Sequence, residues 1–298
     1  MLHVEPQAGP APVTHVIEQA QNTVEMNVYE ISSERVLKAI RVACHNGVNV
    51  RVMYERHPYH GGHRVAKEKH ELGQTCAQTE APPQRFEQKY VFDHAKYIVA
   101  DPGTHHGDAE LGTANFSWHA FHKNREYLLT THTPAIVKAL NQVFDADWNR
   151  QQVPQYAKHQ LVLSPHAGGK LQQVIDQPGT VGMEAEEVSG PKPLLNVIAN
   201  KGSKVHMIVP SSISGYDKKR LDYLAHNGVR VRILAQPYMH AKVIIGQSMG
   251  FIGSQNLSQS SILENREVGV ASKSQSFVAK IQHQFKHDWH KARPFHPQ

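Results

Sequence analysis

The sequence predicts an α/β protein made of two similar halves, each with a mostly parallel mixed sheet that helices flank. Three observations support this fold class: helical patterns are followed directly by apolar strands, polar motifs occur twice, and the length suits two domains. The 298 residues allow two domains of about 150 residues each. We therefore expect a fused internal duplication, with domains at residues 1–152 and 153–298 and a linker at the polar, proline-containing residues 151–155.

The first half contains one clear strand–helix–strand unit. Residues 24–32 predict a strand, and residues 34–45 carry apolar side chains at helical spacing. Gly47 then suits the C-terminal cap of that helix, and the apolar residues 48–53 predict a second strand. A helix that joins two strands in this way favours parallel pairing between them.

The second half repeats this pattern. The sequence of residues 45–53 recurs almost unchanged at residues 226–234, where a helix again ends at a glycine before an apolar strand. One further helix–strand unit is expected in this half. The predicted elements are strands at residues 181–189, 205–209 and 229–234, and helices at residues 194–200 and 217–226.

A stronger repeat consists of polar residues. A His-x-Lys motif followed by β-branched residues occurs twice, and each copy precedes a loop of small residues and then an Asn-Arg-Glu triplet. The offset between copies is 146 residues for the His and Lys, and 141 residues for the loop Asn and the Glu. Such a recurrence of four residue types in order is highly specific. The two sets are His94, Lys96, Asn115 and Glu126, and His240, Lys242, Asn256 and Glu267.

These residue types suit a phosphate group. On a strand, His and Lys two positions apart point to the same face. A Lys is a poor neighbour for a metal cation but a good one for a phosphate oxygen. An Asn in a small-residue loop can bring its amide and backbone N–H groups to the same anion. We therefore expect phosphate binding by Lys96, Lys242, Asn115 and Asn256.

The remaining residues suit acid–base and nucleophilic chemistry. A Glu can hold an imidazole in one tautomer. Two half-sites that face each other place two His around one phosphorus, so that one attacks it while the other protonates the leaving oxygen and later activates water. No metal or other cofactor is expected, because the two Lys supply the positive charge.

The two blocks resemble the paired His-x-Lys-x₄-Asp motifs of the phospholipase D superfamily, including its bacterial-type phosphodiesterases and nucleases, and the resemblance covers both halves of the chain. It implies a pseudo-twofold pair of α/β domains, a shared site at their interface and a covalent phosphohistidine. By this resemblance His94 is the nucleophile and His240 the general acid and base. Each His is expected to share a half-site with the Lys, Asn and Glu of its own half.

The acid of the family motif is present in one copy only. Asp101 occupies that position in the first copy, whereas Gln247 occupies it in the second. In the family this acid is mainly structural, so activity is expected to survive, with the second side more loosely held because Gln247 cannot form a charged pair.

Non-catalytic roles are the alternatives for the whole chain and for its other His residues. The alternative for the whole chain is a phosphate-binding module that does not turn over substrate. Three other groups of His are expected to be solvated surface rather than metal sites. They are His57, His60 and His63; His105 and His106; and His283, His287 and His290.

The substrate is less determined. The net charge of +6 favours anionic partners only mildly. The insertion at residues 55–90 is polar and mixed in charge, which fits either a nucleic-acid contact or a solvated loop. We expect a nuclease acting on DNA or RNA, preferably single strands. The alternative is a phospholipase D or phosphatidyltransferase acting on phospholipid.

Location and assembly are left open by the sequence. No stretch reaches the roughly 18 apolar residues of a membrane span, and the first residues lack signal-peptide features. The protein is expected to be cytoplasmic, or exported after removal of a signal peptide, and a monomer suffices because both motifs lie in one chain. With two cysteines, a disulfide framework is excluded. Cys44 and Cys76 are expected to be free, pairing being the alternative for an exported protein.

Overall fold

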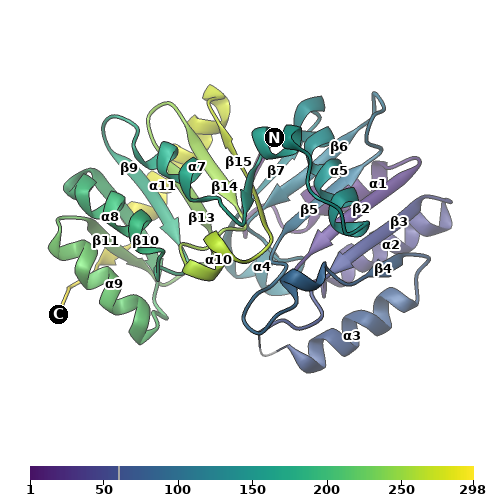
Figure 1. Cartoon of the computed structure of the whole chain (residues 1–298), viewed down its shortest axis with the longest axis horizontal. Helices are drawn as coiled ribbons and strands as arrows, with labels where there is room; N and C mark the ends of the chain where they lie inside the picture. The colour runs from purple at the N-terminus through teal and green to yellow at the C-terminus, as the bar shows by residue number, and fades with distance from the viewer. Residues whose placement is uncertain (60) are drawn as a thin grey trace.

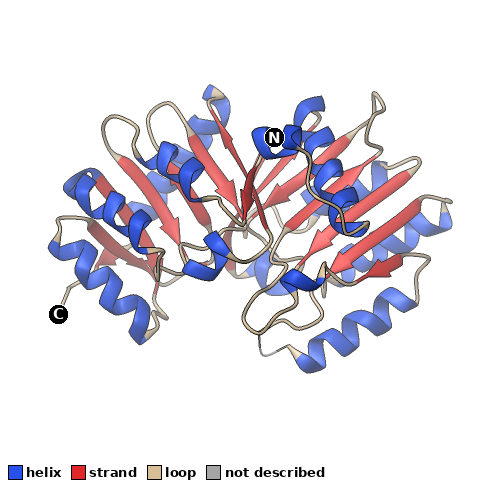
Figure 2. Ribbon diagram, viewed as in Figure 1, coloured by secondary structure: helices blue, strands red, loops and turns tan. Residues whose placement is uncertain are grey.

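The computed structural model describes residues 1–59 and 61–298 and shows two α/β halves, each built on an eight-stranded sheet (Figures 1 and 2). The first sheet has the strand order β1-β7-β6-β5-β2-β3-β4, and β12 joins it by pairing with β7. Its own strands are β1 (Leu2–Glu5), β2 (Thr23–Val28), β3 (Asn49–Tyr54), β4 (Gln78–Glu80), β5 (Lys96–Ala100), β6 (Asp108–Gly112) and β7 (Asn124–Thr131).

The second sheet has the same arrangement. Its order, β8-β15-β14-β13-β9-β10-β11-β16, repeats that of the first sheet strand for strand and adds β16 at one edge. The predicted duplication is therefore confirmed in the topology. The strands of this half are β8 (Val162–Ser164), β9 (Val181–Ala185), β10 (Val205–Pro210), β11 (Arg230–Leu234), β12 (Tyr238–Met239), β13 (Lys242–Ile245), β14 (Gly250–Gly253), β15 (Glu267–Ser272) and β16 (Arg293–Pro294).

The sheets are mixed, as predicted, but the parallel part of each is smaller than expected. Parallel pairing joins β2 to β3, β3 to β4 and β12 to β7 in one sheet, and β9 to β10 and β10 to β11 in the other. The strands that follow each His-x-Lys motif pair antiparallel: a turn joins β5 to β6 and β13 to β14, and a loop with one short helix joins β6 to β7 and β14 to β15. A helical crossover enforces parallel neighbours, whereas a hairpin enforces antiparallel ones. The expectation of mostly parallel sheets was wrong because only the crossover units were recognised.

Helices cover the faces of both sheets (Figure 2). The predicted helix at residues 34–45 is confirmed as α2 (Glu34–His45). Residues 149–154 connect α5 to α6, and Gln155 of the expected linker is the first residue of α6. The other helices are α1 (Ala11–Gln19), α3 (Gly62–Gly73), α4 (Trp118–His122), α5 (Pro134–Trp148), α6 (Gln155–Gln160), α7 (Gly168–Ile175), α8 (Lys192–Lys201), α9 (Gly215–His226), α10 (Gln259–Leu263), α11 (Gln275–Lys291), and the short η1 (Gln84–Phe86) and η2 (Gly202–Lys204).

The strand order corrects the alignment of the two halves. It makes α2 and β3 equivalent to α8 and β10, and α3 and β4 equivalent to α9 and β11. The near-identical sequences at residues 45–53 and 226–234 therefore lie on units that are not equivalent. The expected extra unit of the second half was also wrong, because its counterpart lies in the insertion at residues 55–90. The strand β4, Gln78-Thr79-Glu80, is short, polar and at the sheet edge, so no apolar pattern marks it.

One apolar core joins the halves. It includes Tyr97 and Leu111 of the first sheet, Val243 and Ile252 of the second, and side chains of α5 and α11. A second core lies within the first half and a third within the second. The division at residues 152 and 153 stays a prediction, but the shared core indicates that the two halves are packed firmly against each other.

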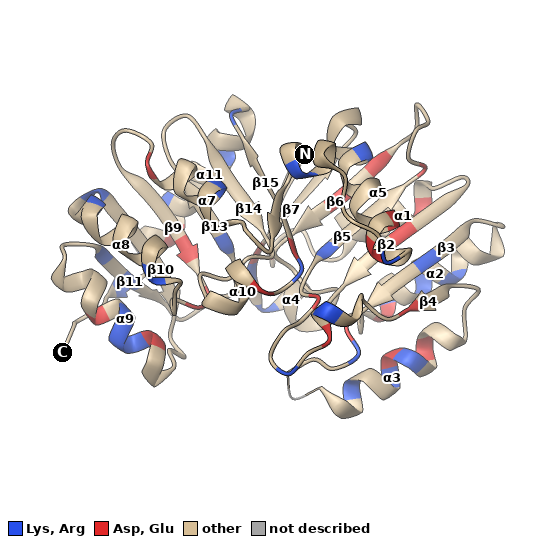
Figure 3. Ribbon diagram, viewed as in Figure 1, with Lys and Arg blue, Asp and Glu red and all other residues tan. Residues whose placement is uncertain are grey.

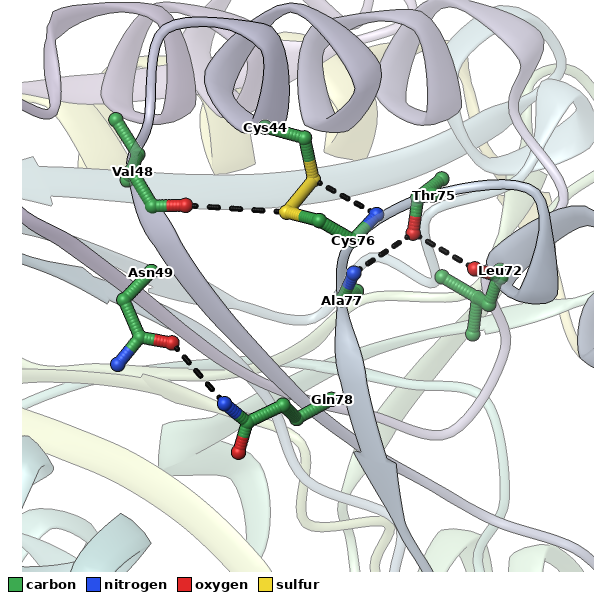
Figure 4. The surroundings of a disulfide bond; sticks show 8 residues. All are labelled: Cys44, Val48, Asn49, Leu72, Thr75, Cys76, Ala77 and Gln78. Carbon is green, nitrogen blue, oxygen red and sulfur yellow. Dashed lines mark hydrogen bonds between the residues drawn. A yellow bond between two sulfur atoms is a disulfide. The ribbon is translucent and has the colours of Figure 1, made fainter.

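Cys44 and Cys76 form a disulfide, so the expectation of free thiols was wrong. The bond joins the last turn of α2 to the turn that precedes β4 (Figure 4), with Cα atoms 5.5 Å apart. The same turn is fixed by the Thr75 hydroxyl, which donates to Leu72 O at 2.7 Å and accepts from Ala77 N at 3.0 Å. The α3–β4 unit, which the sequence did not reveal, brings the two cysteines together.

Candidate active site

The two His-x-Lys motifs begin the central strand of each sheet. Lys96 is the first residue of β5 and Lys242 the first of β13. The chain before each His is bonded to the opposite half: His94 N donates to Arg266 O at 2.9 Å, and His240 N donates to Arg125 O at 3.3 Å. The strand starts therefore meet where the halves join, near α4 and α10 in Figure 1.

Each His is held by the Glu of the other half. Nδ1 of His94 lies 3.0 Å from Oε2 of Glu267, and Nδ1 of His240 lies 2.6 Å from Oε1 of Glu126. The expected half-sites, with His94 beside Glu126 and His240 beside Glu267, were therefore wrong in their pairing. Because a buried carboxylate favours the N–H tautomer at Nδ1, this exchange leaves Nε2 of His94 available for chemistry.

The two Glu are themselves fixed by matching partners. Glu126 accepts from Thr113 Oγ1 at 2.6 Å and from Asn124 Nδ2 at 3.1 Å. Glu267 accepts from Ser261 Oγ, and from Asn265 Nδ2 at 3.2 Å. Both Glu are fully buried. Burial would raise the pKa of Glu267, but His94 and Lys96 outweigh it and lower that pKa, so the group is anionic.

The two Lys differ in their surroundings. Lys96 Nζ donates to His94 O at 2.7 Å and lies 5.1 Å from the ring centroid of Tyr29. Lys242 Nζ donates to His240 O at 2.6 Å and to Glu186 Oε2 at 2.7 Å. Both ammonium groups are almost completely buried. One Lys therefore has an aromatic neighbour where the other has a carboxylate.

Tyr29 and Glu186 occupy equivalent positions. The register pairs Val28 with Lys96 and Ala185 with Lys242, and Tyr29 and Glu186 are the next residues along. The sequence reasoning assigned neither residue a role. The signal was present, because both follow a buried strand at its carboxyl end, where functional side chains of α/β proteins gather.

The presence of Tyr29 in one half and Glu186 in the other gives the two Lys different pKa values. Burial lowers the pKa of Lys96 to about 7, against the attraction of Glu267. Burial also disfavours the charge of Lys242, but Glu186 and Glu126 outweigh it and raise its pKa. Burial alone would raise the pKa of Glu186, yet His240 and Lys242 lower it to about 2. Burial also lowers the pKa of His94, which favours its neutral form.

The two loop Asn residues follow β6 and β14. Asn256 lines a small cavity together with Lys242, and its backbone N–H donates to Ser261 Oγ at 2.8 Å. The Oδ1 atoms of Asn115 and Asn256 are buried and have no hydrogen-bond partner among the described residues. Their contact with a phosphate stays a prediction.

The motif acid Asp101 is structural in this fold. Its carboxylate accepts from the backbone N–H groups of Gln21, Asn22 and Thr23 at 2.7 to 2.8 Å. In the second half, Gln177 holds the corresponding turn: its Oε1 accepts from Ser248 N at 3.1 Å and its Nε2 donates to Met249 O at 2.9 Å. Neutral hydrogen bonds thus replace the carboxylate beside Gln247, whose looser hold stays a prediction.

Two buried ion pairs cross between the halves. Arg125 donates to Asp288 at 2.6 and 3.1 Å, and Arg266 donates to Asp147 at 2.7 and 2.8 Å. Each Arg lies next to a Glu that holds a His, so the pairs fix the chain on which the site depends. In the sequence, the signal for these ion pairs is that an Asn-Arg-Glu triplet and an Asp-Trp pair each occur once in both halves.

No group of three or more His, Cys, Asp or Glu that could hold a metal ion occurs among the described residues. His60 lies outside those residues, so the group His57, His60 and His63 is described only in part. Within the same described residues, no helix is both long and apolar enough to cross a membrane.

Comparison with known proteins shows the family of the chain. The model of the family described as "Cardiolipin synthase, PLD-like domain" matches residues 13–148 and 192–289. The chain belongs to the phospholipase D superfamily. No curated protein sequence matches it.

Solved structures share the superfamily fold. A phosphatidylserine synthase from Haemophilus influenzae aligns with a TM-score of 0.71 at 11% identity, covering 99% of this chain and 87% of that chain. A polyphosphate kinase from Porphyromonas gingivalis aligns with a TM-score of 0.70 at 14% identity, covering 97% of this chain. The present chain spans only 50% of that kinase chain. Nuc, a phospholipase D family member from Salmonella typhimurium, is similar to 46% of this chain at 19% identity, with a TM-score of 0.43.

Proposed function

We propose that the protein is a metal-independent phosphodiesterase that acts through a covalent phosphohistidine. The observation that carries this proposal is the crossed arrangement of two His, each bonded at Nδ1 to a buried Glu of the opposite half and followed by a buried Lys. This arrangement provides two imidazoles at one junction and a cationic group beside each of them.

The surroundings of the two His support different roles. His94 has a lowered pKa and one carboxylate partner, so it is the neutral nucleophile. His240 lies between Glu126 at Nδ1 and Glu186, whose Oε2 is 3.3 Å from Nε2. Each ring nitrogen thus faces a carboxylate oxygen that can accept an N–H hydrogen bond, so His240 is suited to supply a proton.

The reaction then has two balanced steps. His94 Nε2 attacks the phosphorus, the P–N bond forms, and the bond to the leaving oxygen breaks as that oxygen takes the proton of His240. In the second step His240 removes a proton from water, the water oxygen bonds to phosphorus, and the P–N bond breaks to release neutral His94. Lys96, Lys242, Asn115 and Asn256 balance the negative charge of the phosphoryl oxygens in both steps.

For the substrate we propose nucleic acid, preferably single-stranded. Cationic and aromatic side chains lie in the segment that directly precedes His94. The Lys89 ammonium lies 5.2 Å from the ring centroid of Tyr90, and Tyr90 and Phe92 line the same surface pocket two to four residues before His94. Bases can stack on such rings while the cations hold phosphates.

A phospholipid substrate is the second candidate. The matching family model is described as a cardiolipin synthase domain, and the aligned synthase from Haemophilus influenzae is named for phosphatidylserine. In this chain, Trp118 on α4 and Leu263 on α10 are exposed, and each follows one of the two Asn loops. Exposed apolar side chains beside a site are one means of contacting a lipid surface.

One assay separates the candidates. The protein is incubated in parallel with a labelled single-stranded oligonucleotide and with vesicles of phosphatidylcholine and phosphatidylglycerol. Each substrate is tested with and without excess EDTA. We expect cleavage of the oligonucleotide. Lipid turnover with an intact oligonucleotide would assign the second candidate, and loss of all turnover on adding EDTA would contradict the metal-free mechanism. Turnover of neither substrate would favour a binding module.

A further inference from the structure

A groove of about 620 Å³ lies between α8, α9 and the start of α10 in the C-terminal half. Its apolar base includes the buried Leu195, and Tyr216 and Tyr223 line it with exposed rings. Lys192 and Arg220 add positive charge. The volume lies within the roughly 300–1,000 Å³ of typical ligand sites. The groove thus combines aromatic rings with cations.

The aromatic rings are held in place. The Arg220 guanidinium lies 4.9 Å from the Tyr216 ring centroid, and its Nη2 donates to Tyr216 Oη at 2.9 Å. The Tyr223 hydroxyl donates to Asn196 Oδ1 at 3.2 Å. Arg220 Nε is buried without a hydrogen-bond partner among the described residues. Rings fixed in this way lose little freedom when a base stacks on them.

The charge around the groove favours an anion. Residues 192–226 contain six Lys or Arg and two Asp, and Figure 3 shows basic residues along α9. The carboxylate of Asp217 accepts from Ser214 Oγ at 2.7 Å and from Val188 N at 3.3 Å, so it is engaged in holding α9. The groove therefore complements a phosphate chain.

Two segments connect the lining of the groove to residues of the proposed active site. Ser189, on its lining, follows Glu186 by three residues and donates its backbone N–H to Leu257 O at 2.8 Å. Leu257 is the residue after Asn256, and Gln259 at the start of α10 also lines the groove. A chain that has a phosphate at the two His can thus extend into the groove along the Asn256 loop.

We propose that this groove is a subsite for single-stranded nucleic acid, in which bases stack on Tyr216 and Tyr223 and phosphates contact Lys192 and Arg220. The assignment rests on the proposed nuclease function. It names where the strand lies on one side of the cleaved bond.

The equivalent region of the N-terminal half shares one loop contact and adds an ion pair. There α3 contacts the loop after β2 at two points: Glu68 Oε1 accepts from Ile31 N at 3.1 Å, and Arg64 Nη1 donates to Glu30 Oε2 at 3.2 Å. In the C-terminal half Asp217, in the first turn of α9, holds the equivalent loop at Val188. The carboxylate contact is thus shared, but Arg64 of α3 is paired with Glu30, whereas Arg220 of α9 is bonded to the Tyr216 hydroxyl. We therefore expect nucleotides on the α9 side of the cleaved bond to contribute more than those on the α3 side.

The test removes the ring and the cation together. The variant Tyr216→Ala/Arg220→Ala is compared with Tyr156→Ala/Lys138→Ala, which removes another exposed Tyr with a cation 4.9 Å from its ring centroid, on α6 and α5. Both lose the same charge. Their kcat/KM is measured on single strands of about two to about twelve nucleotides and on bis(p-nitrophenyl) phosphate, which is too small to reach the groove.

We expect the groove variant to lose about tenfold in kcat/KM on the longest strand and nothing on bis(p-nitrophenyl) phosphate, while the control variant matches the wild type on both. If the groove variant cleaves the longest strand with the same kcat/KM as the wild type, the subsite is overturned and the nuclease function still stands. If the wild type cleaves no strand, fluorescence anisotropy with the same strand decides the subsite: equal binding by wild type and groove variant overturns it, and weaker binding by the variant supports it. Vesicle turnover that depends on Tyr216 and Arg220, without strand binding, would assign the groove to a lipid headgroup and overturn it too.

Discussion

The two halves carry the same His and Lys in different electrostatic surroundings. In the N-terminal half Lys96 faces the ring of Tyr29, whereas in the C-terminal half Lys242 and His240 share the carboxylate of Glu186. The sheet order, the buried Glu and the crossed ion pairs are the same in both. The comparison teaches that the framework of a duplicated fold can stay symmetric while one substitution after an equivalent strand makes its two imidazoles chemically different.

The largest expected effect comes from removing either imidazole. His94→Asn and His240→Asn should each lower turnover by several orders of magnitude, because nucleophile and proton donor act as a unit. With bis(p-nitrophenyl) phosphate, whose leaving group needs little protonation, His240→Asn should still accumulate a labelled phosphoenzyme and His94→Asn should not. A phosphoenzyme in His94→Asn alone would exchange the two roles, and near-normal turnover in either variant would rule out the site.

Removing either of the two crossed ion pairs shows whether both stabilise the packing of the halves to the same extent. Arg266→Ala and Arg125→Ala each remove the two charged hydrogen bonds of a fully buried Asp, which costs about 3–5 kcal/mol of unfolding free energy. Urea denaturation followed by circular dichroism measures this. The control is Arg41→Ala, which breaks an exposed pair with Glu34 and should cost less than about 1 kcal/mol. A cost as small as that of the control would show that the pairs do not hold the halves together.

The exchange of Glu between halves makes a directional prediction. Glu267→Gln should impair His94, and Glu126→Gln should impair His240, each by roughly 10²–10³-fold. The loss in Glu126→Gln should shrink with a p-nitrophenolate leaving group, because less proton donation is needed, whereas the loss in Glu267→Gln should persist. If both losses respond equally to the leaving group, the two His do not have separate roles.

The smallest expected effect concerns pH. The pKa of Lys96 is lowered to about 7, so its ammonium is present below that pH and is lost above it, and kcat/KM should fall about tenfold per unit on the basic side. The pKa of Lys242 is raised, so it keeps its charge there. Tyr29→Glu gives the first half the carboxylate of the second and should move this basic limb to higher pH. An unmoved limb in Tyr29→Glu would mean that another group is responsible.

Much of the local structure was predictable from the sequence. The strand that begins at each Lys and the helix at residues 34–45 have apolar side chains at strand or helical spacing, and these patterns depend on neighbours along the chain. The edge unit α3–β4 was not predictable, because its strand is three polar residues long. The disulfide was missed for the same reason, since this unit brings Cys76 beside Cys44.

The membership of the site and its connectivity have different origins. The sequence by itself determined that two His-x-Lys motifs exist with their Asn and Glu companions, because a duplication is visible as a repeat of residue types at constant offsets. Only the tertiary structure decided that His94 is bonded to Glu267 and His240 to Glu126. Residue types and spacing are the same for direct and exchanged pairing, and the choice depends on how two sheets pack across a shared core. The same packing places Glu186 beside His240 and Tyr29 beside His94, so two different residues at equivalent positions of one fold make the halves chemically unequal.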